Sequence, residues 1–224
     1  MKTLIIVPAY NEQENIKKTV QDVQTNLPEY DILVVNDGSL DDTGKILDEL
    51  KINHIDLPVN LGLSGAVQCG YKYAYKNGYD CAIQFDGDGQ HKSEYIPKMI
   101  EKIEEGYDIV IGSRFVNKKK DWSLRMIGSR MISGMIRFST GVKINDPTSG
   151  MRMLNRKMIY DYAFHMNRKP EPDTLAYQIK NEAKVYEIQV DMNEREAGLS
   201  IYSNIWACGN YMLKTLISIF FMIY

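Results

Sequence analysis

Short apolar runs alternate with longer amphipathic stretches through the first half of the chain. The apolar runs contain many β-branched residues and are bounded by polar or glycine-containing segments, which is typical of strands. The predicted strands are 4–7, 32–35, 54–57, 81–85 and 109–111, and the predicted helices are about 12–26, 42–50, 64–76 and 93–105. Strands that alternate with helices form βαβ units, so the pattern predicts the α/β class with a mainly parallel central sheet flanked by helices.

After residue 113 the alternation becomes less regular. A basic run, Lys118 to Lys120, leads into a stretch rich in Met and Arg with helical spacing at 124–138. Two more strands are predicted at about 151–154 and 185–190, with helices at 156–163 and 173–182 between them. The chain contains no internal repeat and no low-complexity linker, so we expect one main domain.

The C-terminal segment differs in composition from the rest. Residues 211–224 are nearly all apolar, and Lys214 is the only charge among them. Because roughly 20 residues are needed to cross a bilayer, this segment is expected to lie on a membrane, to pack on the domain, or to begin a longer span. We therefore divide the chain into a main domain at 1–203 and an apolar helix at 204–224. The apolar run at 4–8 is too short for a signal peptide, so secretion is not expected.

Composition narrows the classes of partner. The chain has 224 residues, a formal net charge of -2 and a pI near 6.0, so nothing in its overall charge attracts nucleic acid, and none is expected as a partner. Cys69, Cys81 and Cys208 are odd in number and widely spaced, without a metal-binding pattern. This usage favours reduced thiols in a cytosolic setting.

An acidic pair follows the predicted strand 81–85. The sequence there is Asp86-Gly87-Asp88-Gly89-Gln90-His91. In open α/β sheets ligands bind beyond the carboxyl ends of the strands, and a hard divalent cation needs oxygen ligands. The spacing therefore indicates a site for a metal and a diphosphate, with a solvated Asp/Gly turn as the alternative. His91 is expected to support this segment rather than to bind the metal.

Three other segments lie where strands end or helices begin. Tyr10 and Glu12 follow the first strand and can stack on a base and accept its hydrogen bonds, although taken alone they are better explained by a strand-to-helix turn capped by Asn11. Asp37 follows the second strand and can bind a base or a ribose. Gly65 lies in a small-residue segment that opens a helix, where backbone N–H groups can approach a ligand. These glycines do not form G-x-G-x-x-G after the first strand, which argues against a dehydrogenase.

The motifs in their order along the chain resemble those of one family. They are PAYNE at 8–12, NDGSLDDT at 36–43, NLGLSGA at 60–66, DGDGQH at 86–91, GSRF at 112–115 and DPTSGMR at 146–152. Over roughly residues 3–200 the chain resembles family 2 glycosyltransferases of the GT-A fold. It is most similar to the dolichyl-phosphate mannose synthase branch, whose acceptor is a polyprenyl phosphate.

The resemblance implies a donor site and a metal. The residues implied to surround the nucleotide are Pro8, Tyr10, Glu12, Asp37, Gly65 and Asp86. The residues implied to bind Mg²⁺ or Mn²⁺ on the diphosphate are Asp86, Asp88 and Gln90. Such an ion offsets the charge that develops on the departing nucleoside diphosphate.

The resemblance also implies an acceptor site. The residues that match positions near donor and acceptor phosphates are Arg114, Arg125, Ser129 and Arg195. The match of Arg195 is imperfect, because Ile201 stands where the family usually has Lys. Asp146 matches a carboxylate near the acceptor, where it acts as a general base or only orients the acceptor. An Asp-Pro turn and solvated arginines are the alternatives. Asp88, Arg125 and Asp146 are the residues implied to be catalytic.

The expected function is metal-dependent, inverting transfer of a hexose from a UDP- or GDP-sugar to polyprenyl (undecaprenyl or dolichyl) phosphate. The expected place is the cytoplasmic face of a membrane, with peripheral or C-terminal attachment. Basic and apolar residues at 118–138 fit a surface that rests on anionic lipid, and packing of its Met residues in the core is the alternative. A homo-oligomer is compatible with the sequence.

Other functions remain open at this point. The same fold also transfers sugars to a saccharide hydroxyl in cell-wall or capsular polysaccharide synthesis. A sugar-1-phosphate nucleotidyltransferase needs a Gly-rich, Arg-bearing loop after the first strand, which PAYNE does not supply. A non-catalytic scaffold that only binds a nucleotide does not require all of the acidic and basic residues named above. Their joint presence therefore argues against a scaffold.

Overall fold

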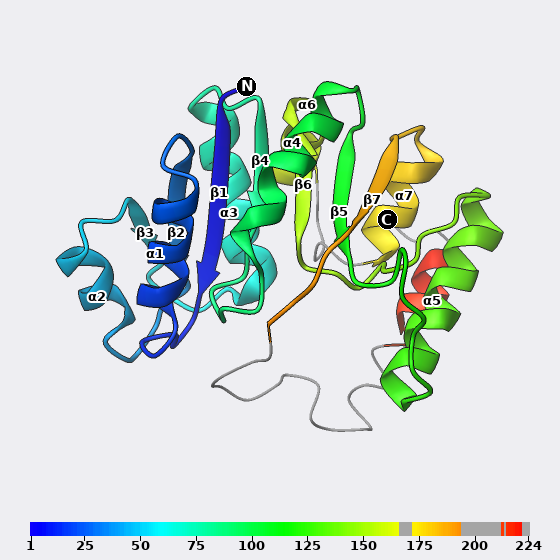
Figure 1. The fold of residues 1–224 in the computed structure, drawn as a ribbon, viewed down its shortest axis with the longest axis horizontal. Coiled ribbons are helices and arrows are strands. Elements are labelled where there is room, and N and C mark those ends of the chain that lie inside the picture. The colour runs from blue at the N-terminus through cyan, green and yellow to red at the C-terminus, as the bar shows by residue number, and fades with distance from the viewer. Residues whose placement is uncertain (166–171, 194–211, 213, 221–224) are drawn as a thin grey trace.

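The computed structural model describes residues 1–165, 172–193, 212 and 214–220, with only the backbone of residues 124 and 125 (Figure 1). Within these residues, seven strands form one sheet in the order β3-β2-β1-β4-β6-β5-β7. Their bounds are β1 (Thr3–Ala9), β2 (Asp31–Asn36), β3 (His54–Asp56), β4 (Cys81–Gln84), β5 (Ile109–Ser113), β6 (Arg152–Asn155) and β7 (Val185–Gln189).

The sheet is mostly parallel. Strand β6 runs antiparallel to its neighbours β4 and β5, and the other neighbouring pairs are parallel. The α/β prediction is therefore confirmed. The antiparallel insertion of β6 between β4 and β5 was not predicted, because pairing partners far apart in sequence leave no local signal.

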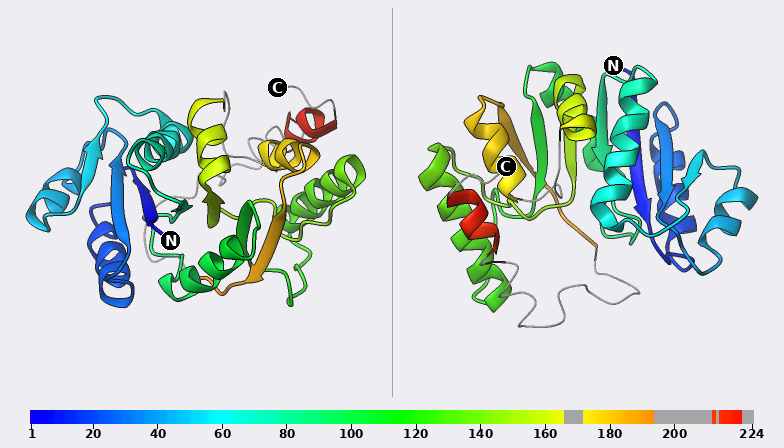
Figure 2. Two further views of the ribbon diagram at one scale, coloured as in Figure 1. Left: turned by 90° about the horizontal axis from the view of Figure 1, so that it is seen from above. Right: turned by 180° about the vertical axis from the view of Figure 1, so that it is seen from behind.

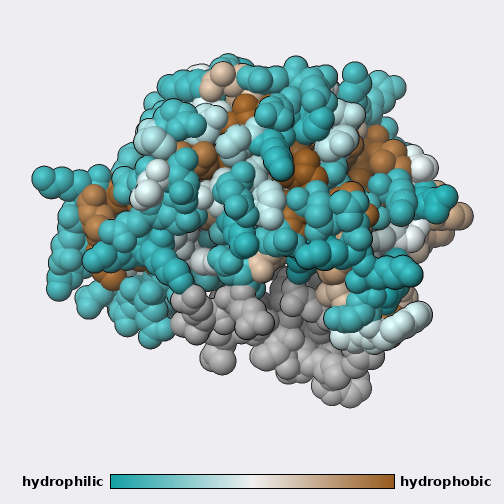
Figure 3. Space-filling model, in the orientation of Figure 1, coloured by the Kyte–Doolittle hydropathy of each residue, from teal (hydrophilic) through white to brown (hydrophobic). Residues whose placement is uncertain are grey.

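Helices cover both faces of the sheet (Figures 1 and 2). One face carries α1 (Ile16–Asn26), α2 (Thr43–Glu49), η1 (Ser93–Tyr95) and α4 (Ile96–Glu104). The opposite face carries α3 (Gly62–Lys76), α6 (Arg156–Phe164) and α7 (Pro172–Lys180), and α5 (Leu124–Thr140) packs against α7. On the face shown in Figure 3, hydrophilic residues predominate and apolar ones are scattered among them.

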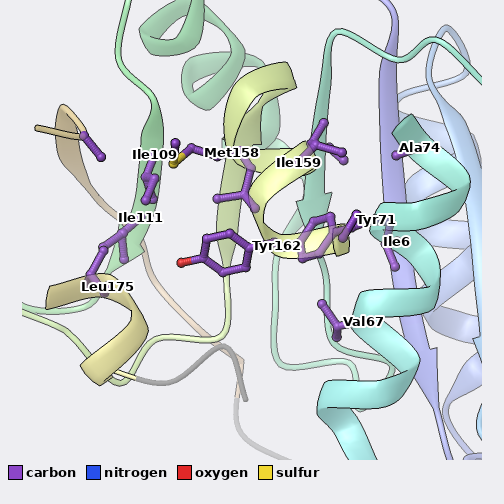
Figure 4. Close-up of a cluster of buried hydrophobic side chains, with 14 of the residues drawn as sticks. Ile6, Val67, Tyr71, Ala74, Ile109, Ile111, Met158, Ile159, Tyr162 and Leu175 are labelled. Atoms are coloured by element: carbon purple, nitrogen blue, oxygen red, sulfur yellow. The ribbon is translucent and has the colours of Figure 1, made fainter. Parts of the chain in front are cut away.

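The two faces have separate cores because side chains alternate along each strand. Leu4 and Ile6 of β1 enter the core beneath α3 and α6, whereas Ile5 and Val7 enter the core beneath α1 and α4. Figure 4 shows the first core, in which Tyr71 of α3 and Tyr162 of α6 meet edge to face with ring centroids 5.8 Å apart. Full burial of the aliphatic side chains in this core, such as Ile6 and Val67, stabilises the fold by about 1.5–3 kcal/mol each.

Helix α1 begins four residues later than the pattern predicts. The cause is Asn11, whose positive φ of 54° turns the chain away from a helix. The next two backbone N–H groups then donate to side chains that follow β2. Glu12 N donates to Thr43 Oγ1 (2.9 Å), and Gln13 N donates to Asp41 Oδ2 (3.1 Å). The expectation that Asn11 caps this helix is wrong, since its Oδ1 accepts from the backbone of the loop after β2.

The described part of the C-terminal segment is helical and packs on the domain. Ile219 is fully buried in the core beneath α3 and α6, and Ser218 Oγ donates to Asp173 Oδ2 of α7 (2.7 Å). Ile217 and Phe220 lie on the other side of this segment and are exposed. Among the described helices, none combines the length and the apolar character that a membrane crossing requires.

Candidate active site

Three parallel strands bring the predicted donor-site residues to one edge of the sheet. Strands β2, β1 and β4 are neighbours, and Ala9 lies opposite Asn36 at their carboxyl ends. Tyr10, Asp37 and Asp86 follow the three strands and therefore meet at the lower edge of the sheet in Figure 1. This is the edge at which open α/β sheets bind ligands.

The loops after β1 and β2 are tied together. Asp37 N donates to Ala9 O (2.8 Å), and Asn11 N donates to Ser39 Oγ (3.0 Å). Tyr10 stands on this paired loop and is about half exposed, and Pro8 lies within β1. A partly exposed aromatic ring on a fixed loop can serve as a stacking surface for a base.

Asp37 joins these loops to the start of α3. Its side chain is only 3 % exposed, and its Oδ1 accepts from Leu61 N (2.7 Å). Gly38 has a φ of +67°, and a Cβ there would lie 2.8 Å from Asn60 N, so the close approach requires glycine. Gly65 lies one turn into α3 and leaves room for Leu61, whose Cβ a side chain at 65 would meet at 2.4 Å. Gly65 thus has a packing role in addition to its predicted place near a ligand.

Gln84 holds the Asp86 carboxylate, and His91 holds the Asp86 backbone. Gln84 Nε2 donates to its Oδ1 (3.0 Å), and the Asp86 N–H donates to Nδ1 of the buried His91 (3.0 Å). His91 Nε2 lies 3.6 Å from Asp86 Oδ2, and its ring packs edge to face on Phe85. This agrees with the expected supporting role of His91.

Gly150 leaves the space that the Asp86 carboxylate occupies. A Cβ at position 150 would lie 2.7 Å from Asp86 Oδ2, closer than real contacts allow. We expect Gly150→Ala to displace this carboxylate and to weaken Mn²⁺-dependent nucleotide binding roughly tenfold or more, since overpacking costs about 1–3 kcal/mol. Calorimetry with UDP or GDP and Mn²⁺ measures the effect. Gly134→Ala is the control, because a Cβ there meets nothing within 4 Å. Equal affinities for the two variants would contradict this role of Gly150.

Asp88 and Gln90 lie on the same loop. Gln90 N donates to Asp88 Oδ1 (3.1 Å), and Gly89, with a φ of +75°, makes the turn between them. In the described part of the chain, no group of three or more His, Cys, Asp or Glu side chains is arranged to hold a metal ion. Two carboxylates and one amide still suit a cation that shares its ligands with substrate phosphates and water. Asp86, Asp88 and Gln90 therefore fit Mg²⁺ or Mn²⁺ that arrives with a diphosphate.

Arg114, which follows β5, and Asp146, which precedes β6, form a bidentate ion pair. Arg114 Nε lies 2.7 Å from Asp146 Oδ2, and its Nη2 lies 2.9 Å from Oδ1. Asp146 is 0 % exposed. Burial acts to raise the pKa of Asp146, but the hydrogen bonds and charge of Arg114, with Lys120, hold it below its usual value. A carboxylate that is ionised and doubly bonded is a poor proton acceptor, so the geometry favours a positioning role for Asp146.

The same pair changes the interpretation of Arg114. Resemblance places this residue near phosphates, yet two of its three guanidinium nitrogens bind Asp146. Glu187 fixes the loop further by accepting from Asn145 N (2.7 Å) and Asp146 N (2.8 Å). Arg114 therefore holds the 146–150 loop beside Asp86.

Lys120 is a candidate that sequence reasoning missed. Its Nζ donates to Ser129 Oγ (2.7 Å) and Ser133 Oγ (3.4 Å) on α5, and it is half-buried. The four-residue spacing of the two serines places them on one helix face, which was the available signal. Arg125 lies in the first turn of α5, where only the backbone is described, and Arg195 lies outside the described residues.

A cavity of about 990 Å³ lies behind the acidic loop. It is bounded by α1 and η1 and includes Phe85, Gly89 and His91. Neither Asp37 nor Asp88 lines it. The chemistry predicted for the strand edge is therefore not located in this cavity.

Comparisons with known proteins agree on one family. The family described as "Glycosyl transferase family 2" matches residues 4–163. The chain is 31 % identical to polyprenol monophosphomannose synthase of Mycolicibacterium smegmatis, over 89 % of this chain and 80 % of that protein. It is 33 % identical to undecaprenyl-phosphate mannosyltransferase of Micrococcus luteus, over 89 % and 79 %.

A solved structure supports the fold. Glucosyl-3-phosphoglycerate synthase of Mycobacterium tuberculosis, crystallised with Mn²⁺, UDP and phosphoglyceric acid, superposes with a TM-score of 0.71. The comparison covers 97 % of this chain and 78 % of that one at 16 % sequence identity. At this identity the likeness concerns the GT-A fold alone.

Proposed function

Because the chain belongs to glycosyltransferase family 2, in its dolichyl-phosphate mannose synthase-like branch, we propose that it transfers a hexose from a UDP- or GDP-sugar to polyprenyl phosphate. The observation that carries this proposal is the meeting of Asp37, Asp86 and Asp88 at one sheet edge. Relatives named for polyprenol and undecaprenyl-phosphate mannosyl transfer support the choice of acceptor.

In this proposal the chain's own residues hold the two ends of the donor. Tyr10, Glu12 and Asp37 bind the base and ribose, and Asp37 is already fixed by Leu61 N. Asp86, Asp88 and Gln90 hold Mg²⁺ or Mn²⁺ at the diphosphate. When bound, the ion supplies positive charge that stabilises the departing nucleoside diphosphate. Gln84 and His91 keep Asp86 in place.

Transfer is proposed to be a single displacement with inversion. An oxygen of the acceptor phosphate forms a bond to the anomeric carbon while the bond from that carbon to the diphosphate oxygen breaks. A phosphate acceptor is already anionic near neutral pH, so no residue has to remove a proton. The pairing of Asp146 with Arg114 suits this reaction, because it leaves Asp146 to order the 146–150 loop.

We also propose that α5 rests on the membrane surface at the cytoplasmic face. Ile127, Met131 and Phe138 repeat at helical spacing and are exposed, and Trp122, just before α5, is 82 % exposed. Met126 is instead buried, so the Met residues divide between the core and the surface. Attachment through the remaining C-terminal residues is part of the same proposal.

Flotation with anionic liposomes tests the membrane surface. We expect the chain to float with the vesicles and the double variant Trp122→Ser, Phe138→Ser to bind at least about a hundredfold more weakly, because burial of each aromatic ring contributes about 1.5–3 kcal/mol. Tyr160→Ser is the control, since Tyr160 is an exposed aromatic residue on α6. Equal flotation of all three proteins would exclude α5 as the contact surface.

The experiment that tests the function has two parts. A thermal-shift panel of UDP- and GDP-sugars with Mn²⁺ identifies the donor, because a ligand that binds only the native state raises Tm. Transfer assays with that donor then compare undecaprenyl phosphate with oligosaccharides. We expect product only with the lipid phosphate, and transfer only to a saccharide hydroxyl would overturn the proposal.

A further inference from the structure

The loop that carries the proposed metal ligands borders a cavity. Gly89 and His91 of this loop line the cavity of about 990 Å³ between α1 and η1. Packing contacts are missing where a loop borders a void, so hydrogen bonds from other elements supply more of its support. The path of this loop therefore depends on the groups that bond to its backbone.

Two residues that line the same cavity make such bonds. Thr19 of α1 is 3 % exposed, and its Oγ1 donates to Gly87 O (3.1 Å). Asn193 Nδ2 donates to Gly89 O (3.2 Å), and Asn193 N donates to Gln90 O (2.9 Å). Asn193 therefore holds two successive carbonyl groups of the loop.

Asn193 comes from a distant part of the chain. It follows β7, the last strand in the sheet order, and lies 104 residues after Gly89. Figure 1 shows the chain leaving β7 and running toward the lower edge of the sheet, where the acidic loop lies. Asn193 lies outside every motif that carries the family resemblance.

The segment that leads from β7 to this residue is itself anchored. Val190 N donates to Ser113 O (2.9 Å), and Asp191 N donates to the Tyr95 hydroxyl (3.1 Å). Met192 packs against the core beneath α1 and α4. A side chain on an anchored segment fixes the loop that it touches, because the segment has little freedom left to lose.

We propose that Asn193 is a positioning residue for the metal site and that Thr19 supports the same loop from α1. The inference rests on the proposed function, in which Asp86, Asp88 and Gln90 hold Mg²⁺ or Mn²⁺. The Gln90 backbone accepts from Asn193 through its carbonyl and donates to Asp88 Oδ1 through its N–H (3.1 Å). The bonds from Asn193 therefore fix the turn that carries two of the ligands, and supporting groups of this kind tune metal affinity without touching the ion.

Calorimetry with UDP or GDP tests the proposal in the presence and absence of Mn²⁺. For Asn193→Ala we expect the Kd of the nucleotide with Mn²⁺ to rise about threefold to tenfold, as the loss of one hydrogen bond predicts. The Kd without metal should stay unchanged. Asn181→Ala is the matched control, because Asn181 is exposed and its Nδ2 also donates to a backbone carbonyl, that of Tyr177 (3.1 Å). Equal Kd values for the two variants with Mn²⁺ would overturn the proposal.

Asn193→Asp separates support of the loop from direct coordination of the ion. Aspartate keeps the shape of the side chain but cannot donate to Gly89 O, so we expect a loss at least as large as that for alanine. Tighter Mn²⁺-dependent binding by this variant would overturn the proposal, because it would assign the side chain to the ion itself.

Hydrogen exchange in the metal-free protein gives a readout that does not involve the ion. The Gln90 N–H bonds to Asp88 Oδ1, so its exchange rate reports on the turn. In Asn193→Ala this amide should exchange about threefold to tenfold faster, and in Asn181→Ala at the wild-type rate. A wild-type rate in Asn193→Ala would contradict the positioning role.

Thr19→Val tests the support from α1 and serves if the Asn193 variants do not fold. Valine has nearly the same volume as threonine and lacks the hydroxyl that donates to Gly87 O. We expect the Kd of the nucleotide with Mn²⁺ to rise about threefold to tenfold in this variant as well. An unchanged Kd would refute the part of the proposal that concerns Thr19.

Failure of this inference is distinguishable from failure of the proposed function. If Mn²⁺ tightens nucleotide binding to the wild type and to Asn193→Ala by the same factor, only the positioning role is refuted. If Mn²⁺ does not tighten the binding of either nucleotide to the wild type, the proposed metal site fails and the positioning role fails with it.

Discussion

Replacing Asp88 with Asn is expected to reduce sugar transfer about a thousandfold or more, and Asp86→Asn should do the same. Both carboxylates are proposed to hold the cation that stabilises charge on the departing nucleoside diphosphate, a contribution of several kcal/mol to the transition state. Asn keeps the shape of the side chain and removes the charge. The measurement is the rate of nucleoside diphosphate release in the presence of donor, polyprenyl phosphate and a saturating divalent cation.

Asp48→Asn is the control for this experiment. Asp48 lies on α2, and its side chain is 78 % exposed, so its replacement should leave the rate unchanged. Wild-type rates for the Asp88 variant, or full activity of the wild type in excess EDTA, would refute the proposed role of the acidic pair.

Arg114→Ala is expected to lower the free energy of unfolding by about 3–5 kcal/mol, because it leaves the buried Asp146 carboxylate without its partner. Urea unfolding followed by circular dichroism measures the change. The double variant Arg114→Ala, Asp146→Asn should recover part of the loss, since it removes the unpaired charge. An Arg114→Ala protein as stable as the wild type would show that the pair does not hold this loop.

The same ion pair predicts a dependence of stability on pH. The pKa of Asp146 is lower in the folded protein than in the unfolded chain, where it is about 3.9. The pair therefore stabilises the fold above about pH 4, and this contribution is lost as the pH falls through the lowered pKa. Asp146→Asn should be less stable than the wild type at neutral pH, and its stability should fall less steeply in acid.

Much of the fold was predictable from local patterns. The strand predicted at 81–85 is β4 (Cys81–Gln84), and the helix predicted at 156–163 is α6 (Arg156–Phe164). In both elements the apolar residues recur with the spacing expected for the structure, and polar residues mark where the element ends. The placement of the acidic pair at a strand end also follows from sequence alone, since Asp86 comes directly after an apolar run.

The features that were not predicted depend on contacts between distant residues. The pairing of Arg114 with Asp146 joins positions 32 residues apart, and neither position carries a local sign of it. The late start of α1 results from the positive φ of Asn11, after which the Glu12 and Gln13 N–H groups bond to residues that follow β2. In the sequence Lys120 is only one member of a basic run, because its burial depends on the packing of α5.

The most direct test of the account is an anomalous difference map from crystals grown with Mn²⁺ and the nucleoside diphosphate that the thermal-shift panel selects. We expect a manganese peak in contact with Asp86 and Asp88, with the nucleotide beside Tyr10 and Asp37. A nucleotide bound elsewhere, such as in the cavity between α1 and η1, with no manganese at these aspartates, would contradict the proposed active site.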